Sequence, residues 1–172
     1  MSDTEHIRAR EPTIGRRSRA DYTGGVYGSM LAASVVVGAG ALGDFPRLEL
    51  VGLLLLTGVV FWLAHVHAQM FGARLTRLRP DRTVLVHVCR EEWPIVEAAV
   101  PPAVAVAVSP LLGLDLTGTL WLALSVAVAG QVGWSVAAAR RAGAAWPLVA
   151  VTAAVNLVLG LAIIAFKLLI TH

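Results

Sequence analysis

The sequence predicts an all-α integral membrane protein whose five helices cross the bilayer, with the N-terminus in the cytoplasm and the C-terminus outside. Hydrophobic residues make up 57% of the chain and the mean hydropathy is +0.73, so its polar surface is too small to cover a water-soluble fold. Five stretches approach the roughly 20 apolar residues that cross about 30 Å of hydrocarbon. Basic clusters recur at every second connection, which is typical of the cytoplasmic side.

The predicted spans form one domain and cover residues 25–42, 50–71, 95–114, 117–139 and 146–169. Residues 1–23 are predicted to be a basic cytoplasmic tail, and residues 24–172 a single transmembrane domain with a cytoplasmic loop at 72–94. The two connections that follow the third and fourth spans are too short to hold a second domain. The tail lacks the short apolar core of a cleaved signal peptide, so we expect the first span to be retained.

Basic residues set the predicted orientation. Twelve of the fourteen Lys and Arg residues fall in the tail, in the segment 74–90 and in the pair Arg140-Arg141, each separated from the next by two hydrophobic stretches. Only Arg47 and Lys167 lie at the predicted outer edge. Arginine greatly outnumbers lysine, and Ala, Val and Gly are abundant, as in proteins encoded by GC-rich genes. We therefore expect the inner, cytoplasmic membrane of a bacterium.

Small residues mark the first span as a close-packing helix. Gly25, Ser29 and Ala33 recur at four-residue spacing, so another backbone can approach them closely. This pattern favours packing inside the protein or at an interface between copies. In the third span, Pro101-Pro102 and Pro110 each remove a backbone hydrogen bond, which predicts either a kink or a face toward protein or water.

Two features of the connections predict local structure. The segment 83–92 alternates valines with other residues, and its pattern leaves open a short interfacial helix or an extended stretch. Trp93-Pro94 and Trp146-Pro147 predict the starts of the third and fifth spans, because proline suits the first turn of a helix and tryptophan suits the headgroup level.

Polar residues inside the spans are the candidate functional residues, because they seldom face lipid. At 1.5 Å rise per residue, His65 and His67 lie roughly 5 and 8 Å to the cytoplasmic side of the middle of the second span. Gln131 lies about 5 Å and Glu97 about 9 Å to the same side of their own midpoints, and Asn156 lies near the middle of the bilayer. The sequence therefore predicts one polar layer in the inner half and no comparable layer in the outer half.

The two histidines point to nearly opposite faces, because they are two residues apart on a helix. We expect His65 to be the interior one, and His67 to lie at a subunit or lipid boundary or to assist a site at Met70. Neutral imidazole ligates transition metals, so the candidate metal ligands are His65, His67, Met70 and Glu97. The alternative is that each membrane histidine makes a single hydrogen bond to a neighbouring helix.

The fifth span carries a polar stripe. Thr152, Asn156, Gly160 and Lys167 follow one another at offsets of four, four and seven residues, which predicts that Lys167 turns inward. Its nearest acidic partner by depth is Asp115. The alternative is a lysine at the end of a helix that reaches for lipid headgroups.

Arginines at the predicted cytoplasmic surface are candidate ligands of anionic lipid headgroups. They are Arg74, Arg77, Arg79 and Arg82. The positive-inside pattern already explains the net basic charge, so nucleic-acid binding is not supported.

The arrangement resembles the vacuolar iron transporter family. The similarity lies in the run from Tyr27-Gly28-Ser29 to Gly40, in residues 64–74, and in the proline-bearing segment 101–113. It implies a dimer that carries a divalent metal between its first two spans in exchange for protons. The chain departs from the family in three respects. The first span has no carboxylate, the second has histidines where the family has Met and Glu, and the loop at 72–94 is too short for the family's glutamate-rich helices.

Two functions fit these residues. In the first, a homo-oligomeric transporter or channel moves protons or a divalent cation, with His65, Glu97 and Gln131 lining a route from the cytoplasm and Asn156 and Lys167 continuing it outward. In the second, the chain is a non-catalytic subunit or scaffold for a partner protein in the membrane. A membrane-embedded enzyme ranks lower, because no catalytic motif is present, and no cofactor is indicated beyond a divalent metal as substrate.

Overall fold

The computed structural model describes residues 13–42, 46–75 and 82–170, and these ranges contain helices but no strand. The elements are α1 (Thr13–Ala41), α2 (Arg47–Leu75), α3 (Arg82–Glu91), α4 (Pro94–Val108), the 3₁₀ helix η1 (Ser109–Leu112), α5 (Leu116–Arg141) and α6 (Trp146–Ile170). Five segments are long and apolar enough to cross a membrane: Tyr22–Ala41, Arg47–Gly72, Arg82–Leu112, Leu116–Arg141 and Trp146–Leu169. The prediction of an all-α chain with five helices suited to cross a bilayer is confirmed.

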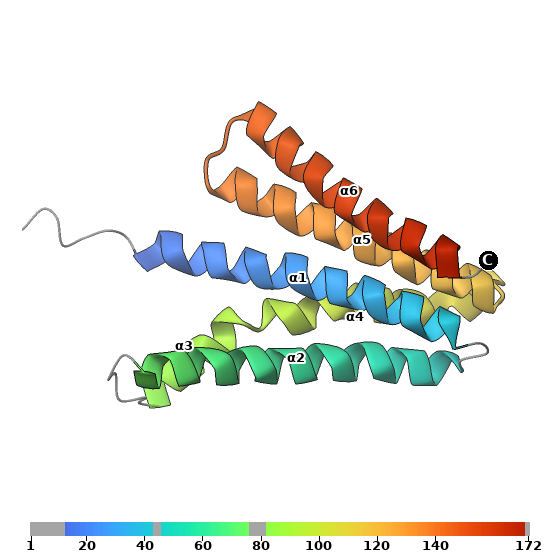
Figure 1. Cartoon of the computed structure of the whole chain (residues 1–172), viewed down its shortest axis with the longest axis horizontal. Helices are drawn as coiled ribbons and strands as arrows, with labels where there is room; N and C mark the ends of the chain where they lie inside the picture. The colour runs from blue at the N-terminus through green and yellow to red at the C-terminus, as the bar shows by residue number, and fades with distance from the viewer. Residues whose placement is uncertain (1–12, 43–45, 76–81, 171–172) are drawn as a thin grey trace, which may run out of the picture.

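The helices lie side by side, with α1 between the pair α2 and α4 and the pair α5 and α6 (Figure 1). The start of α1, the end of α2, α3 and the α5–α6 connection lie at one end of the bundle, which we call the arginine-rich end because it holds Arg82, Arg90, Arg140 and Arg141. The end of α1, the start of α2, η1 and the last turn of α6 lie at the other end, which we call the Asp115 end.

Helix boundaries differ from the predicted ones mainly in α1 and near α3. Helix α1 begins at Thr13, well before the predicted span at 25–42, because a helix can continue past the apolar residues that hydropathy detects. The segment at 83–92, for which two structures were open, is helical through Glu91. The Trp62 indole Nε1 donates a hydrogen bond to the Cys89 carbonyl at 2.9 Å, which fastens α3 to α2.

Local signals explain where α5 begins and ends. The Asp115 carboxylate accepts a hydrogen bond from the backbone N–H of Gly118 at 2.7 Å, so it caps the first turn. Arg140 and Arg141 lie in the last turn, where positive charge is favourable. Gly143 follows with a φ of 71°, a left-handed conformation that glycine adopts without strain and that ends the helix.

The small residues of α1 pack inside the protein. Gly28 lies so close to α4 that a β-carbon placed on it would stand 2.6 Å from the Ile95 carbonyl oxygen. Ser29 and Ala33 are almost fully buried, and the Ser29 hydroxyl donates to the Gly25 carbonyl at 2.9 Å. The four-residue pattern of the first span therefore serves contacts within one chain.

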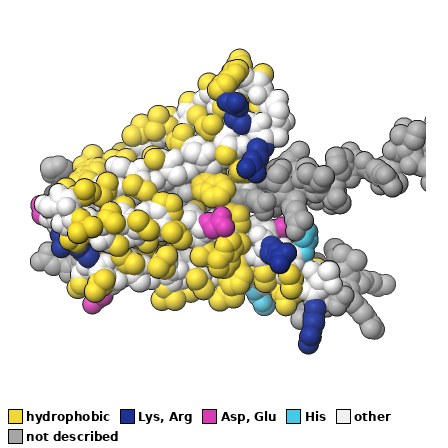
Figure 2. All heavy atoms as spheres, turned by 180° about the vertical axis from the view of Figure 1, so that it is seen from behind, with side chains coloured by type: hydrophobic (Ala, Val, Ile, Leu, Met, Phe, Trp, Pro, Cys, Tyr) yellow, Lys and Arg dark blue, Asp and Glu magenta, His cyan; other side chains and the backbone are white. Residues whose placement is uncertain are grey.

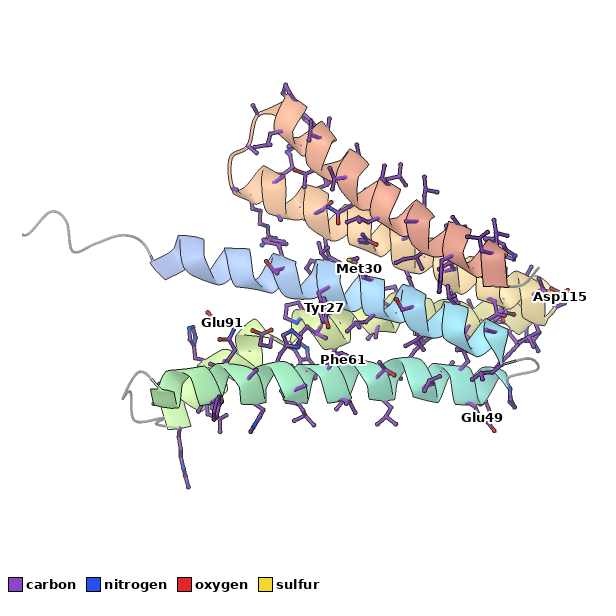
Figure 3. The ribbon with its side chains drawn as sticks, viewed as in Figure 1. Tyr27, Met30, Glu49, Phe61, Glu91 and Asp115 are labelled. Carbon is purple, nitrogen blue, oxygen red and sulfur yellow. The ribbon has the colours of Figure 1, made fainter. Side chains whose placement is uncertain are left out.

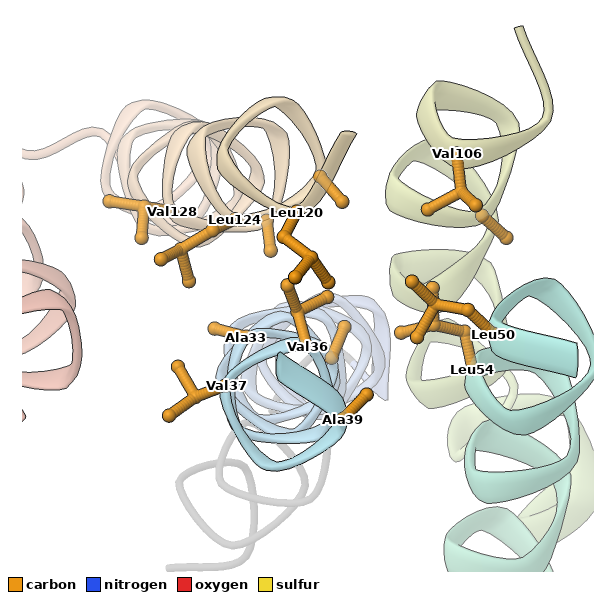
Figure 4. Close-up of a cluster of buried hydrophobic side chains, with 14 residues drawn as sticks. Ala33, Val36, Val37, Ala39, Leu50, Leu54, Val106, Leu120, Leu124 and Val128 are labelled. Atoms are coloured by element: carbon orange, nitrogen blue, oxygen red, sulfur yellow. The ribbon is translucent and has the colours of Figure 1, made fainter. Parts of the chain in front are cut away.

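The apolar core lies where α1 meets α2, α4 and α5, toward the Asp115 end (Figure 4). Its fully buried side chains include Val36, Leu50, Val106 and Leu124. In hydrocarbon, such helices associate through van der Waals packing more than through removal of apolar surface from water. On the face shown in Figure 2, side chains are mostly hydrophobic along the bundle, and Lys and Arg lie toward its two ends. This is the surface expected of a membrane protein.

Candidate functional site

A cavity of about 740 Å³ lies between α1, α5 and α6. It forms where α5 and α6 diverge from α1 near the arginine-rich end (Figure 1). Polar groups line part of an otherwise apolar wall, and the polar or charged residues that line it are Tyr22, Thr23, Tyr27, Ser135, Arg141, Thr152 and Asn156. A hollow of this size and mixed character is the usual form of a small-molecule site.

Two predicted site residues meet at the inner wall of this cavity. Gln131 of α5 is fully buried, and its Nε2 donates to the Asn156 backbone carbonyl at 3.1 Å and to the Asn156 Oδ1 at 3.3 Å. The Asn156 Nδ2 in turn donates to the Thr152 carbonyl at 3.0 Å. The Gln131 Oε1 is buried without a hydrogen-bond partner in the described part of the chain. The structure thus joins α5 and α6 through two residues that the sequence analysis assigned to one polar layer.

Tyr22 and Arg141 stand at the arginine-rich end of the cavity. Tyr22 is 6% exposed, and its hydroxyl has no hydrogen-bond partner among the described residues. The Arg141 guanidinium lies 5.5 Å from the centre of the Tyr22 ring, within the range of a cation–π contact. Sequence reasoning placed Tyr22 in the tail and missed it, because hydropathy marks apolar residues and α1 starts before them.

A second hollow, of about 440 Å³, continues between α1 and α6 toward the Asp115 end. Met30 lines both hollows; it lies on α1 (Figure 3). Apart from Ser34, the second hollow is lined by apolar residues and Gly38. The two hollows meet at Met30, and we call them together the α1–α6 groove.

Lys167 turns inward, as the stripe on the fifth span predicted. Only 7% of it is exposed, and its Nζ lies 4.5 Å from the centre of the Trp121 ring. The Asp115 carboxylate caps α5 at Gly118, and its pairing with Lys167 stays a prediction. Among the described residues, the one ion pair is His87–Glu91 on α3, at 3.0 Å.

His65 and His67 face different surroundings, as their spacing predicted. His65 is half-buried, its Nδ1 lies 3.0 Å from the Phe61 carbonyl of its own helix, and its ring centre lies 5.1 Å from that of Tyr27 on α1. Tyr27 also meets Phe61 edge-on in the space between α1 and α2 (Figure 3). His67 is exposed. His65 therefore lies behind Tyr27, outside the lining of the cavity.

The predicted metal ligands do not form a cluster within the described chain. No three His, Cys, Asp or Glu side chains come together there in a way that could hold one metal ion. Glu97 is exposed on the first turn of α4, and Met70 is half-buried on α2. A metal site at His65, His67, Met70 and Glu97 stays a prediction.

Two of the four arginines predicted to meet lipid headgroups fall within the described residues, at or near the arginine-rich end. Arg82 is exposed at the start of α3, and Arg74 lies near the end of α2. Arg77 and Arg79 fall outside the described residues. Their role in lipid binding stays a prediction.

A second polar cluster lies at the Asp115 end, where the sequence analysis named no site residues other than Asp115 and Lys167. Thr119 and Ser109 are fully buried, and the Thr119 hydroxyl donates to the Ser109 hydroxyl at 2.8 Å. Arg47 donates from Nη2 to the Leu114 carbonyl at 2.7 Å and from Nε to the Thr119 hydroxyl at 3.4 Å. One signal in the sequence could have revealed this cluster. Ser109 and Thr119 flank a short turn between antiparallel helices, and such a turn brings the residues on its two sides together.

We expect Arg47→Met to lower the free energy of unfolding by about 1.5 kcal/mol, because hydrogen bonds from a charged group contribute more than neutral ones. Thermal unfolding of the purified protein in detergent, followed by circular dichroism, measures the change. Glu49→Gln is the control, since Glu49 is exposed in the same helical turn. Equal unfolding temperatures for Arg47→Met and the parent would show that the cluster contributes nothing to stability.

Comparisons with protein-family models, with curated proteins and with solved structures give no match. The resemblance to vacuolar iron transporters therefore stays a prediction. The functional argument depends on the cavity and on the polar residues around it.

Proposed function

We propose that this chain is a small multi-pass membrane transport protein whose cargo enters the cavity between α1, α5 and α6. The observation that carries the proposal is the Gln131–Asn156 pair, because Asn156 lines the cavity and Gln131 lies fully buried behind it. Polar residues inside a membrane helix cost free energy when they leave water, so a functional site is the first explanation to test.

A route along α6 supports the proposal. Thr152 and Asn156 line the first hollow, the apolar second hollow follows, and Lys167 is buried near the far end of the helix. The residues lie on one face of α6 because their spacing follows the helical repeat. A cargo that entered near Arg141 would meet Thr152 and Asn156 and then the apolar second hollow, whereas Lys167 lines neither hollow.

The charges along this route favour an anionic cargo over a divalent cation. Arg141 lines one end of the cavity, whereas His65 and Glu97, the expected cation ligands, do not line it. Pathways for anions use Arg and Lys, and pathways for cations use carboxylates. Transport of a proton or of a divalent metal, as expected from sequence, is the alternative to be tested beside it.

Orientation and assembly follow from the same proposal. With the arginine-rich end in the cytoplasm, the cavity lies at the depth of the inner leaflet of a bacterial cytoplasmic membrane. A homo-oligomer, with a dimer favoured, remains our expectation, since five helices are few for a pathway of their own.

A second candidate is a non-catalytic membrane subunit. It is favoured by the way polar groups bond to one another across helices, as Gln131 does to Asn156 and Arg47 to Leu114. Such bonds hold helices together without any chemistry. Flux measurements separate the two functions.

The test is flux into liposomes that contain the purified full chain. Protons, a divalent metal and chloride or phosphate are followed in separate experiments under imposed gradients, with protein-free liposomes as background. We expect flux of at least one cargo, and a decrease of roughly tenfold or more in Gln131→Leu, because one hydrogen-bonding amide at the route is lost.

Ser125→Leu is the matched control, since Ser125 is a polar, exposed residue on the same helix and does not line the cavity. Equal flux in Gln131→Leu and Ser125→Leu would contradict the route. Absence of flux for every cargo would favour the subunit, and copurification from membranes would then be the decisive measurement.

A further inference from the structure

The groove between α1 and α6 joins a polar end to an apolar channel. At the arginine-rich end it offers Arg141, Tyr22 and the hydroxyl and amide side chains of Thr152 and Asn156. Past Met30 its lining is apolar except for Ser34. This distribution of polar and apolar lining matches a molecule that has a charged head and a hydrocarbon chain.

The length of the groove fits one leaflet's acyl chain. From Tyr22 to Met30 the first hollow follows α1 for about 12 Å, at 1.5 Å per residue. The second hollow continues along α1 from Met30 to Ala41, a further 16 Å or so. A chain that covers half of the roughly 30 Å hydrocarbon layer would pass Met30 and end in the second hollow.

The polar end fits a phosphate. The Tyr22 hydroxyl is a buried donor without a partner among the described residues, and the Arg141 guanidinium lies 5.5 Å from the centre of the Tyr22 ring. A buried hydroxyl without a partner is costly, and an acceptor oxygen at this place would remove that cost. Arginine adds charge complementarity and the geometry that suits phosphate.

We propose that the α1–α6 groove binds an anionic phospholipid drawn from the leaflet at the arginine-rich end. Its phosphate lies at Arg141 and Tyr22, and one acyl chain lies along the groove past Met30. This inference deepens the proposed function: that the lipid is a cargo rests on the proposed transport. The binding site itself is tested separately from movement.

Two substitutions probe the two ends of the site. Arg141→Gln removes the charge at the head, and Arg140→Gln is its control, because Arg140 stacks on the Trp146 ring at 4.2 Å and does not line the cavity. Gly38→Leu fills the second hollow, and a β-carbon at Gly38 meets nothing within 4 Å. Gly52→Leu is its control, since Gly52 has equally open surroundings on α2.

Native mass spectrometry of the full chain in mild detergent measures the retention of phosphatidylglycerol against phosphatidylcholine with the same chains. We expect one phosphatidylglycerol per chain and a preference of about tenfold or more, because the quaternary ammonium of phosphatidylcholine offsets the phosphate charge that attracts Arg141. Arg141→Gln should remove the preference, and Gly38→Leu should lower retention of both lipids, while both control variants behave as the parent. A thermal unfolding curve verifies that each variant folds.

Equal retention of the two lipids by the parent, or unchanged retention in Gly38→Leu, would overturn the proposal. The proposal would also be overturned if the parent forms a dimer with no lipid bound and Gly38→Leu dissociates that dimer. A second copy of the chain would then fill the groove. Movement between leaflets is measured with fluorescent phosphatidylglycerol and an impermeant quencher. Selective retention without movement or ion flux supports the lipid site and contradicts transport, whereas ion flux without selective retention overturns the lipid site alone.

Discussion

Gly28→Leu is expected to destabilise the protein by about 3 kcal/mol, the upper part of the range for overpacking a well-packed interior. A β-carbon at Gly28 would lie 2.6 Å from the Ile95 carbonyl oxygen and 2.9 Å from the Ala98 β-carbon. The first of these atoms belongs to the backbone of α4, so it cannot move aside by a change of rotamer. Helices α1 and α4 would have to separate.

Unfolding in mixed detergent micelles, followed by circular dichroism, measures this effect. Gly38→Leu is the control on the same helix, because its β-carbon meets no atom within 4 Å. We expect that variant to unfold as the parent does. Similar unfolding curves for Gly28→Leu and Gly38→Leu would show that α1 and α4 are not in close contact.

Substitutions at Gln131 and Asn156 are expected to separate function from stability. Gln131→Leu removes two hydrogen bonds to Asn156, but it also removes a buried oxygen that has no partner among the described residues. Hydrogen bonds between membrane helices contribute about 0.6 kcal/mol each on average. The gain and the losses therefore nearly cancel, and we expect stability to change by less than about 1 kcal/mol.

Transport, by contrast, should fall roughly tenfold or more in Gln131→Leu and in Asn156→Leu, because each loses an amide at the same place on the route. In the double variant, which carries both Gln131→Leu and Asn156→Leu, the loss of flux should be no greater than in either single variant. The effects of substituting two residues that act as one unit are not additive. The measurement combines flux in liposomes with unfolding of the four proteins. Flux that survives in all variants, or that falls only in step with stability, would identify the pair as a packing contact.

The sequence determined the class of the protein and the depth of its polar residues. Uninterrupted apolar stretches must become helices in a bilayer, since each backbone polar group needs a partner within its own segment. The described part of the chain contains five helices long and apolar enough to cross a bilayer. Depth follows from the fixed rise per residue, which is why Gln131 and Asn156 could be placed at one level before their contact was known.

Which face of a helix points inward could be predicted only where the spacing of polar residues along that helix indicated it. Lys167 follows Thr152 and Asn156 along one face, and it is buried as that spacing predicted. Its pairing with Asp115 stays a prediction, because the turn after η1 directs one Asp115 carboxylate oxygen to the first turn of α5. Spacing along one helix contains no information about the end of a neighbouring one.

Tertiary structure alone decided which polar residues meet and where the protein is hollow. Arg47 joins Thr119 across 72 positions of sequence, and Tyr22 meets Arg141 because α1 lies beside α5. The groove lies where α6 diverges from α1 (Figure 1). The angle between two helices is set by how their side chains pack together. Composition and periodicity determine which segments enter the bilayer and how deep each residue lies, whereas contacts between helices depend on all the surfaces that pack together.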